Sequence, residues 1–224
     1  MLETPRPHPN LPPSREKGEN AVLLPEDEWI LMPMIDANIK FMPAFYRPPL
    51  TGQYMRALLD EVTWTQEKIY IGGADRLQPR LSAWYGDEGK DYTYSGITLE
   101  PHPWTPTLLR IKEDIEAATG DHFNSVLVNL YRNERDSVGW HSDDERELGS
   151  NPVIASLSLG ETRTFKFKHR KRKDQKTVSL PLTDGSLLIM AGTTQKCWRH
   201  AVGKEREAKG PRINLTFRNV VTAR

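Results

Sequence analysis

The stretch VIASLSLGETRTFKFKH, residues 153–169, contains two segments in which side chains of different polarity alternate, divided by Gly160 and Glu161. Alternation with a period of two is typical of β-strands, because successive side chains point to opposite faces. Four further segments indicate strands: 125–133, 177–182, 185–192 and 212–220. Short strands divided by turn residues suggest an antiparallel sandwich or barrel. We therefore expect an α+β fold with a double-stranded β-helix, or jelly-roll, core.

Two earlier segments have apolar residues at helical spacing, and we expect both helices to pack outside this core. Residues 49–64 predict a helix with Thr51 as its N-cap. Residues 103–120 predict a second helix, capped by Thr105 and ended by Gly120. Its buried face is expected to contain Leu108, Ile111 and Ile115.

The composition fits one domain with an appended tail. The 224 residues carry a net charge of +1, so overall charge does not mark a nucleic-acid binder. The single cysteine, Cys197, excludes an internal disulfide and fits a reducing compartment. Residues 1–20 are polar and rich in proline, which predicts a disordered tail, followed by a single domain over 21–224.

No apolar run reaches the roughly 18 residues that a membrane span requires, and the N-terminus lacks the apolar core of a secretory signal. We expect a cytoplasmic monomer without membrane contact.

The segment RINLTFR (212–218) places Arg212, Asn214, Thr216 and Arg218 on one face of a strand. One interpretation is an ordinary strand with one face in water. The other is a wall that binds anions, because arginine holds carboxylates in a two-bonded fork.

A metal site is indicated by GWHSDDE (139–145). In an extended segment His141, Asp143 and Glu145 would share one face, and His200 could supply a third ligand. Two histidines and one carboxylate form the facial triad of non-haem Fe(II) oxygenases, although a catalytic zinc site also uses three protein ligands. Two simpler explanations are an ion pair between Asp143 and Arg146 and a surface position for His200. A triad with open positions beside an arginine wall fits 2-oxoglutarate, which would chelate iron and pair with arginine.

Several motifs of the sequence resemble the AlkB family of Fe(II)/2-oxoglutarate nucleic-acid dealkylases, in particular the branch of the duplex-DNA repair members. The resemblance runs from about Pro79 to Val220 and rests on N-x-Y (129–131), GWHSDDERE (139–147), SLSLG (156–160), His200 and PRINLTFR (211–218). It implies a DNA repair dioxygenase that demethylates 1-methyladenine and 3-methylcytosine with Fe(II), 2-oxoglutarate and O2, releasing formaldehyde, succinate and CO2. Residues 21–100 would form an extension with a nucleotide-recognition segment, and 101–224 the catalytic core.

The resemblance also implies residue roles. His141, Asp143 and His200 would bind Fe(II). Arg212, Asn214 and Tyr131 would hold the distal carboxylate of 2-oxoglutarate, in a wall that includes Thr216, while Arg218 and Asn129 would serve the end next to iron. The segment YGDEGKDYTYSG (85–96) resembles the family's substrate-recognition segment. Tyr94 would stack on a base that lies near the His141 ring, Glu145 and Tyr92 would bind its exocyclic amine, and Ser95 belongs to the same segment. Asp144 is expected to pair at the surface.

The partner expected from the resemblance is alkylated DNA, single- or double-stranded, or RNA. Family members that repair duplexes carry an aromatic wedge where this chain has Gly72 and Gly73, which weakens the case for duplex DNA, although Leu77 offers a substitute. The basic run 169–173, with Lys204, Arg206 and Lys209, either contacts phosphates or is a solubilising surface. Alternatives are an oxygenase acting on RNA, protein or lipid, and a non-catalytic nucleic-acid-binding module. From the absence of targeting signals and the compact size we expect a cytoplasmic, nucleoid-associated bacterial protein, with a nuclear location left open.

Overall fold

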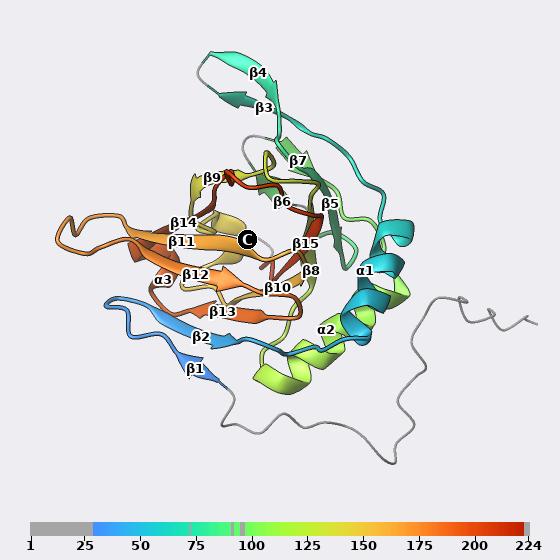
Figure 1. Cartoon of the computed structure of the whole chain (residues 1–224), viewed down its shortest axis with the longest axis horizontal. Helices are drawn as coiled ribbons and strands as arrows, with labels where there is room; N and C mark the ends of the chain where they lie inside the picture. The colour runs from blue at the N-terminus through green and yellow to red at the C-terminus, as the bar shows by residue number, and fades with distance from the viewer. Residues whose placement is uncertain (1–28, 72, 91, 95–96, 222–224) are drawn as a thin grey trace, which may run out of the picture.

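Two antiparallel sheets form the centre of the computed structural model, which describes residues 29–71, 73–90, 92–94 and 97–221 (Figure 1). The larger sheet has the strand order β1-β2-β13-β10-β15-β8-β5 and the smaller one β12-β11-β14-β9. Strands β8 to β15 divide four and four between the two sheets. This arrangement confirms the expected jelly-roll core with helices outside.

The larger sheet contains β1 (Ile30–Leu31), β2 (Asn38–Met42), β5 (Leu81–Gly86), β8 (Ser125–Tyr131), β10 (Ile154–Gly160), β13 (Leu187–Ala191) and β15 (Arg212–Arg218). The smaller sheet contains β9 (Val138–His141), β11 (Arg163–His169), β12 (Val178–Leu182) and β14 (Trp198–Val202). All six strands expected from sequence alternation are present.

Helices α1 (Leu50–Glu61) and α2 (Pro106–Thr119) pack on the outer face of the larger sheet (Figure 1). In α2 the Thr105 side chain accepts a hydrogen bond from the Leu108 N–H, and Gly120 ends the helix in the left-handed conformation, as expected. The Thr51 cap was wrong: Thr51 is the second residue of α1, and Pro49 stands at the cap position without a side-chain hydrogen bond.

The helices explain why the alternating pattern of β15 does not mean that one face is in water. Ile213, Leu215 and Phe217 pack in the core that α1 and α2 share with the larger sheet. The polar side chains of β15 point the other way, yet every residue of this strand is buried. Of the two interpretations, the wet face is therefore excluded, and the polar face of β15 lies inside the molecule between the two sheets.

Two hairpins and two short helical turns complete the fold. Strands β3 (Lys68–Ile71) and β4 (Ala74–Leu77) form a hairpin that projects from the body, and β6 (Tyr92–Tyr94) pairs with β7 (Ile97–Leu99) (Figure 1). The turns are a 3-10 helix at Arg146–Leu148 and α3 at Thr194–Cys197. In the first hairpin Leu77 is 54% exposed, and Gly72 lies outside the described residues, as does the expected tail over 1–20.

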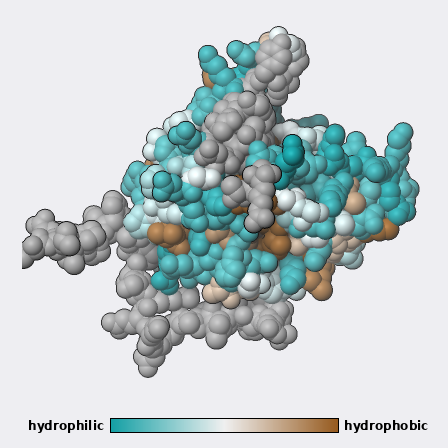
Figure 2. Space-filling view, turned by 180° about the vertical axis from the view of Figure 1, so that it is seen from behind, coloured by the Kyte–Doolittle hydropathy of each residue, from teal (hydrophilic) through white to brown (hydrophobic). Residues whose placement is uncertain are grey.

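The coloured part of the face shown in Figure 2 is mainly hydrophilic, and its apolar side chains form separate patches. No helix in the described part of the chain is long and apolar enough to cross a membrane.

Candidate active site

Three metal-binding side chains meet between the two sheets. His141 ends β9, Asp143 follows two residues later, and His200 lies within β14. Residues His141 and His200 are directly paired in the smaller sheet, and their ring centroids are 4.3 Å apart. One ligand atom from each of the three side chains lies within 4.8 Å of the others. The grouping expected from the sequence is therefore present, and His200 is buried rather than a surface residue.

A β-bulge in β9 aims His141 at this site. Val138 pairs with Val202 and His141 with His200, so β9 has one more residue between these pairs than β14 has. As a result both Val138 and His141 line the same cavity, although they are three residues apart. The carbonyl of Gly139 accepts a hydrogen bond from Nδ1 of His141 at 2.8 Å, which leaves Nε2 with a lone pair for a metal.

Asp143 reaches the site by a different route from the extended segment that the sequence suggested. The strand ends at His141, and the backbone N–H of Asp143 donates to the side-chain oxygen of Gln195 at 3.0 Å. Oδ1 of Asp143 accepts from Nη2 of Arg218 at 2.7 Å, while Oδ2 lies 3.7 Å from Nε2 of His200. Asp143 thus pairs with Arg218 and not with Arg146.

The charge states favour metal binding. Burial lowers the pKa of His200 to about 3, with a further contribution from His141, and burial likewise lowers the pKa of His141. Burial alone would raise the pKa of Asp143, but Arg218 and the two histidines outweigh it and hold this pKa well below its usual value. Two neutral imidazoles and one carboxylate are the ligand forms that a divalent ion requires.

The cavity beside the triad has a polar wall made by the larger sheet. It is lined by Arg80, Asn129, Tyr131, Ser156, Asn214, Thr216 and Arg218, with apolar side chains that include Leu127, Phe165 and Met190. Asn214 and Asn129 are paired neighbours on β15 and β8. The predicted anion-binding wall is therefore a single surface that faces the metal ligands.

Arg212 lies at the end of this wall, outside the residues that line the cavity. Its Nη2 donates to Ser158 Oγ at 2.9 Å, and its guanidinium carbon lies 5.1 Å from the centre of the Tyr131 ring. Among the described residues, Nε and Nη1 of Arg212 have no hydrogen-bond acceptor although both are buried. Burial lowers the pKa of Arg212 to about 10, so the group stays charged at neutral pH. Buried, unsatisfied cationic donors fit an anionic ligand such as a carboxylate.

Asn214 is already engaged by the protein. Its amide nitrogen donates to Ser156 Oγ and to the carbonyl of Leu157, and its side-chain oxygen accepts from Thr216. In this conformation Asn214 orders the wall, and its direct contact with a carboxylate stays a prediction.

Sequence reasoning missed four residues that shape the site. Nε of Arg80 donates to Oδ1 of Asn129 at 2.7 Å, and the Phe165 ring stacks on His200 with centroids 5.1 Å apart. Ser156 and Ser158 lie opposite Thr216 and Asn214 on the neighbouring strand. The two serines could have been found, because SLSLG shows the same alternation as RINLTFR. Arg80 precedes its strand and carries no such signal.

The predicted base-recognition residues are only partly described by the structure. Tyr92 and Tyr94 are in β6, but their side chains, like Ser95 itself, lie outside the described residues. Glu145 precedes the 3-10 helix and is not among the residues that line the cavity. Asp144 forms an ion pair with Arg170 at the surface, as expected.

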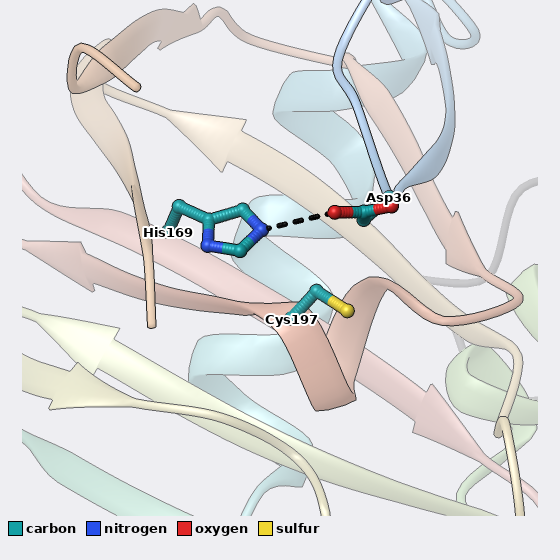
Figure 3. A group of neighbouring side chains, drawn as sticks. All are labelled: Asp36, His169 and Cys197. Atoms are coloured by element: carbon teal, nitrogen blue, oxygen red, sulfur yellow. Dashed lines mark hydrogen bonds and ion pairs between the residues drawn. The ribbon is translucent and has the colours of Figure 1, made fainter. Parts of the chain in front are cut away.

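A second group, Asp36, His169 and Cys197, also brings possible metal ligands within 4.8 Å of one another (Figure 3). Here Nδ1 of His169 accepts hydrogen bonds from the backbone N–H groups of Lys171 and Arg172. The ring proton of the neutral histidine must then be on Nε2, which faces Asp36 at 3.3 Å. No ring lone pair remains for a metal, so we interpret this group as a structural link.

Comparisons with known proteins agree with this site. Residues 38–218 match the model of the 2OG-Fe(II) oxygenase superfamily. The chain is 50% identical over 192 residues to alpha-ketoglutarate-dependent dioxygenase alkB homolog 3 of Bos taurus, covering 82% of this chain and 66% of that protein. For the human homolog 3 the identity is 45% over 198 residues, with 85% and 68% covered. The chain thus spans about two thirds of the length of these relatives.

A human protein named DNA oxidative demethylase ALKBH2 is 39% identical over 188 residues, covering 76% of this chain and 72% of that protein. The solved structure of OsALKBH1 covers 81% of this chain and 96% of its own with a TM-score of 0.60; at 17% identity this likeness shows the fold alone. The chain belongs to the 2OG-Fe(II) oxygenase superfamily and, within it, to the AlkB family of Fe(II)- and 2-oxoglutarate-dependent dioxygenases.

Proposed function

We propose that this chain is a nucleic-acid repair dioxygenase that removes methyl groups from base nitrogens, with 1-methyladenine and 3-methylcytosine as its substrates. The observation that carries the proposal is the position of the triad, which lines one cavity together with polar side chains that include Asn129, Tyr131 and Arg218. The human relative named DNA oxidative demethylase ALKBH2 shares 39% of the aligned residues with this chain.

The residues present fit Fe(II) and 2-oxoglutarate. His141, Asp143 and His200 would hold the metal, and their protonation states need little change to do so. Arg212 would hold the distal carboxylate with its two unsatisfied donors, next to the Tyr131 ring. Bound together with O2, these cofactors supply the oxidation of the N-methyl group, which leaves as formaldehyde while 2-oxoglutarate becomes succinate and CO2.

Neighbouring side chains hold the metal-binding residues in position and exclude water from the cavity. Arg218 fixes one oxygen of Asp143, so only the other oxygen is directed toward His200 and the metal position. Phe165 covers the His200 ring and, with Leu127 and Met190, supplies the apolar part of the cavity. Arg80 fixes the Asn129 side-chain oxygen, which sets the orientation of this amide near the metal. Such packing and outer hydrogen bonds orient metal ligands.

A methylated base would enter from the side of β9 and the β6–β7 hairpin. The target atom of a base inside a duplex is out of reach, so the base must be flipped out or already unpaired. We propose Glu145 and Tyr92 at the exocyclic amine and Tyr94 at the base face, with Ser95 in the same substrate-recognition segment. A carboxylate and aromatic rings favour the cationic methylated base over the neutral one.

The intact triad argues against a non-catalytic binding module, and the acceptor-less donors of Arg212 argue against a zinc hydrolase. Three expectations stay predictions: that the substrate is DNA or, alternatively, RNA, that the chain is a monomer, and that it is located in the cytoplasm or the nucleus.

The test uses protein reconstituted with Fe(II) without oxygen, then mixed with air, 2-oxoglutarate and oligonucleotides of one sequence. These carry 1-methyladenine or 3-methylcytosine in single-stranded DNA, duplex DNA or RNA. Mass spectrometry should show loss of the methyl group from at least one substrate. Succinate formed at the same rate with and without any methylated base would contradict the proposal.

A further inference from the structure

We propose that the outer face of the smaller sheet binds single-stranded nucleic acid beside the base that occupies the cavity. This surface, the basic sheet face, consists of Trp140, Lys166, Lys168 and Arg199. The inference rests on the proposed function, and it adds a binding surface that lies outside the catalytic cavity.

The three cations share one face because of strand alternation. In β11, Phe165 and Phe167 are buried between the sheets, so Lys166 and Lys168 point to the opposite side and are exposed. In β14, His200 points inward and its neighbour Arg199 is exposed. Lys168 and Arg199 are paired across the two strands, and Lys166 is the next outward residue.

The positive charges of Lys166, Lys168 and Arg199 repel one another unless an anion is bound. Like charges placed directly opposite each other on a sheet face are destabilising. Other cations of the same region are neutralised: Arg170 pairs with Asp144, and Arg172 pairs with Asp174. In the part of the chain that the structure describes, Lys166, Lys168 and Arg199 form no ion pair with a carboxylate. Spaced, unneutralised cations of this kind complement a phosphodiester backbone.

Trp140 adds a second, independent feature. It is 43% exposed, although tryptophan is highly buried on average. The bulge in β9 turns Val138 and His141 into the cavity and leaves Trp140 outside. Because β9 is the edge strand of its sheet, Trp140 and the metal ligand His141 are neighbours on two sides of the same edge.

Proteins that bind single-stranded nucleic acid commonly combine exposed aromatic rings with cations that have no partner within the protein. Unpaired bases stack on the ring while the cations contact phosphates. The base faces of a duplex are covered by their neighbours, so a duplex could use only the cations. The β11–β12 hairpin continues the surface, and this end of the molecule, at the right in Figure 2, is hydrophilic.

The experiment measures binding of unmodified, labelled oligonucleotides of one sequence by fluorescence anisotropy, as single-stranded DNA, single-stranded RNA and duplex DNA. The test variant is Lys166→Glu/Lys168→Glu. The matched control, Lys40→Glu/Arg56→Glu, changes the charge equally at exposed positions of β2 and α1. We expect the test variant to lose roughly tenfold or more in single-strand affinity and about 1.4 in the salt slope, because each phosphate contact contributes about 0.7. The control should lose much less.

Trp140→Ala should weaken single-strand binding by roughly five- to a hundredfold and leave duplex binding nearly unchanged, while Trp140→Phe should keep most of the affinity. Circular dichroism checks that each variant is folded. If Trp140→Ala does not fold, the Lys166→Glu/Lys168→Glu variant alone tests the surface, because these two lysines lie on a different strand from His141.

Equal losses in the test variant and the matched control would overturn the inference, as would equal losses for duplex and single strand in both Trp140→Ala and the lysine variant. The binding assay uses unmodified strands and does not depend on demethylation. A chain that binds strands at this face without demethylating them would refute the proposed function alone, whereas demethylation without any effect of these variants on binding would refute this surface alone.

Discussion

Loss of Arg218 from its ion pair with Asp143 should be among the most destabilising single changes in this protein. The two charges are 2.7 Å apart, and their side chains are 3% and 2% exposed. At an effective dielectric constant near 20 their attraction is about 6 kcal/mol, most of which offsets the cost of burying both charges. Arg218→Met leaves the Asp143 carboxylate buried without its cation. We expect it to lower the free energy of unfolding by about 3–5 kcal/mol without added metal.

The neighbouring carboxylate provides a matched control. Asp144 pairs with Arg170, but these side chains are 44% and 31% exposed. Because solvent screens an exposed pair, Arg170→Met should change the free energy of unfolding by less than about 1 kcal/mol. A divalent metal at the triad should recover part of the loss in Arg218→Met, because it neutralises the same carboxylate.

Urea unfolding at neutral pH, with and without Co(II), measures all of these quantities. A loss of less than about 1 kcal/mol in metal-free Arg218→Met would refute the argument that Arg218 compensates the charge of Asp143. An equal loss in both variants would show that burial does not decide the strength of these pairs.

Three further predictions concern pH, the cosubstrate and the second cluster. The pKa of His200 is lowered to about 3 in the fold, so below about pH 6.5 the unfolded chain binds a proton that the folded chain does not. Stability of the metal-free protein should therefore decrease as pH falls, by about 1 kcal/mol from pH 6.5 to 5.5 for this residue alone; a flat urea midpoint over that range would contradict the shift. Arg212→Ala should raise the KM for 2-oxoglutarate roughly tenfold or more, since a charged hydrogen bond contributes about 1.5–3 kcal/mol, with little change in the KM for the oligonucleotide; an unchanged value in succinate assays would place the carboxylate elsewhere. Cys197→Ser should leave Co(II) binding at one ion per chain, and a cobalt–thiolate absorption band in the unaltered chain would disprove the structural interpretation of Asp36, His169 and Cys197 (Figure 3).

Local patterns predicted the parts of this fold that depend on neighbouring residues. The cap at Thr105, the buried face of α2 and the six alternating strands all follow from interactions within one element. Thr51 shows the limit of such patterns. It is a good capping residue by type, but α1 begins one residue earlier and buries its side chain. The wet-face interpretation of β15 failed because the smaller sheet, which β15 does not join, covers its polar face.

The metal ligands could be found from the sequence because their motif is specific, but the reasons for their geometry could not. The bulge that aims His141 depends on pairing between β9 and β14. The partner of Asp143 is Arg218, 75 residues away, where the sequence offered Arg146 close by. Arg80 reaches Asn129 across 49 residues. Each of these contacts is set by sheet register, which short-range patterns do not report.

One stoichiometric measurement tests most directly whether this triad and this wall carry out oxidative demethylation. A single-turnover reaction with Fe(II), 2-oxoglutarate, O2 and a single strand carrying 1-methyladenine should yield equal amounts of succinate, formaldehyde and unmethylated strand. His141→Ala and Asp143→Ala, checked for folding, should yield none of the three products. Repair by these variants at the full rate, or succinate without formaldehyde in the unaltered chain, would contradict the account.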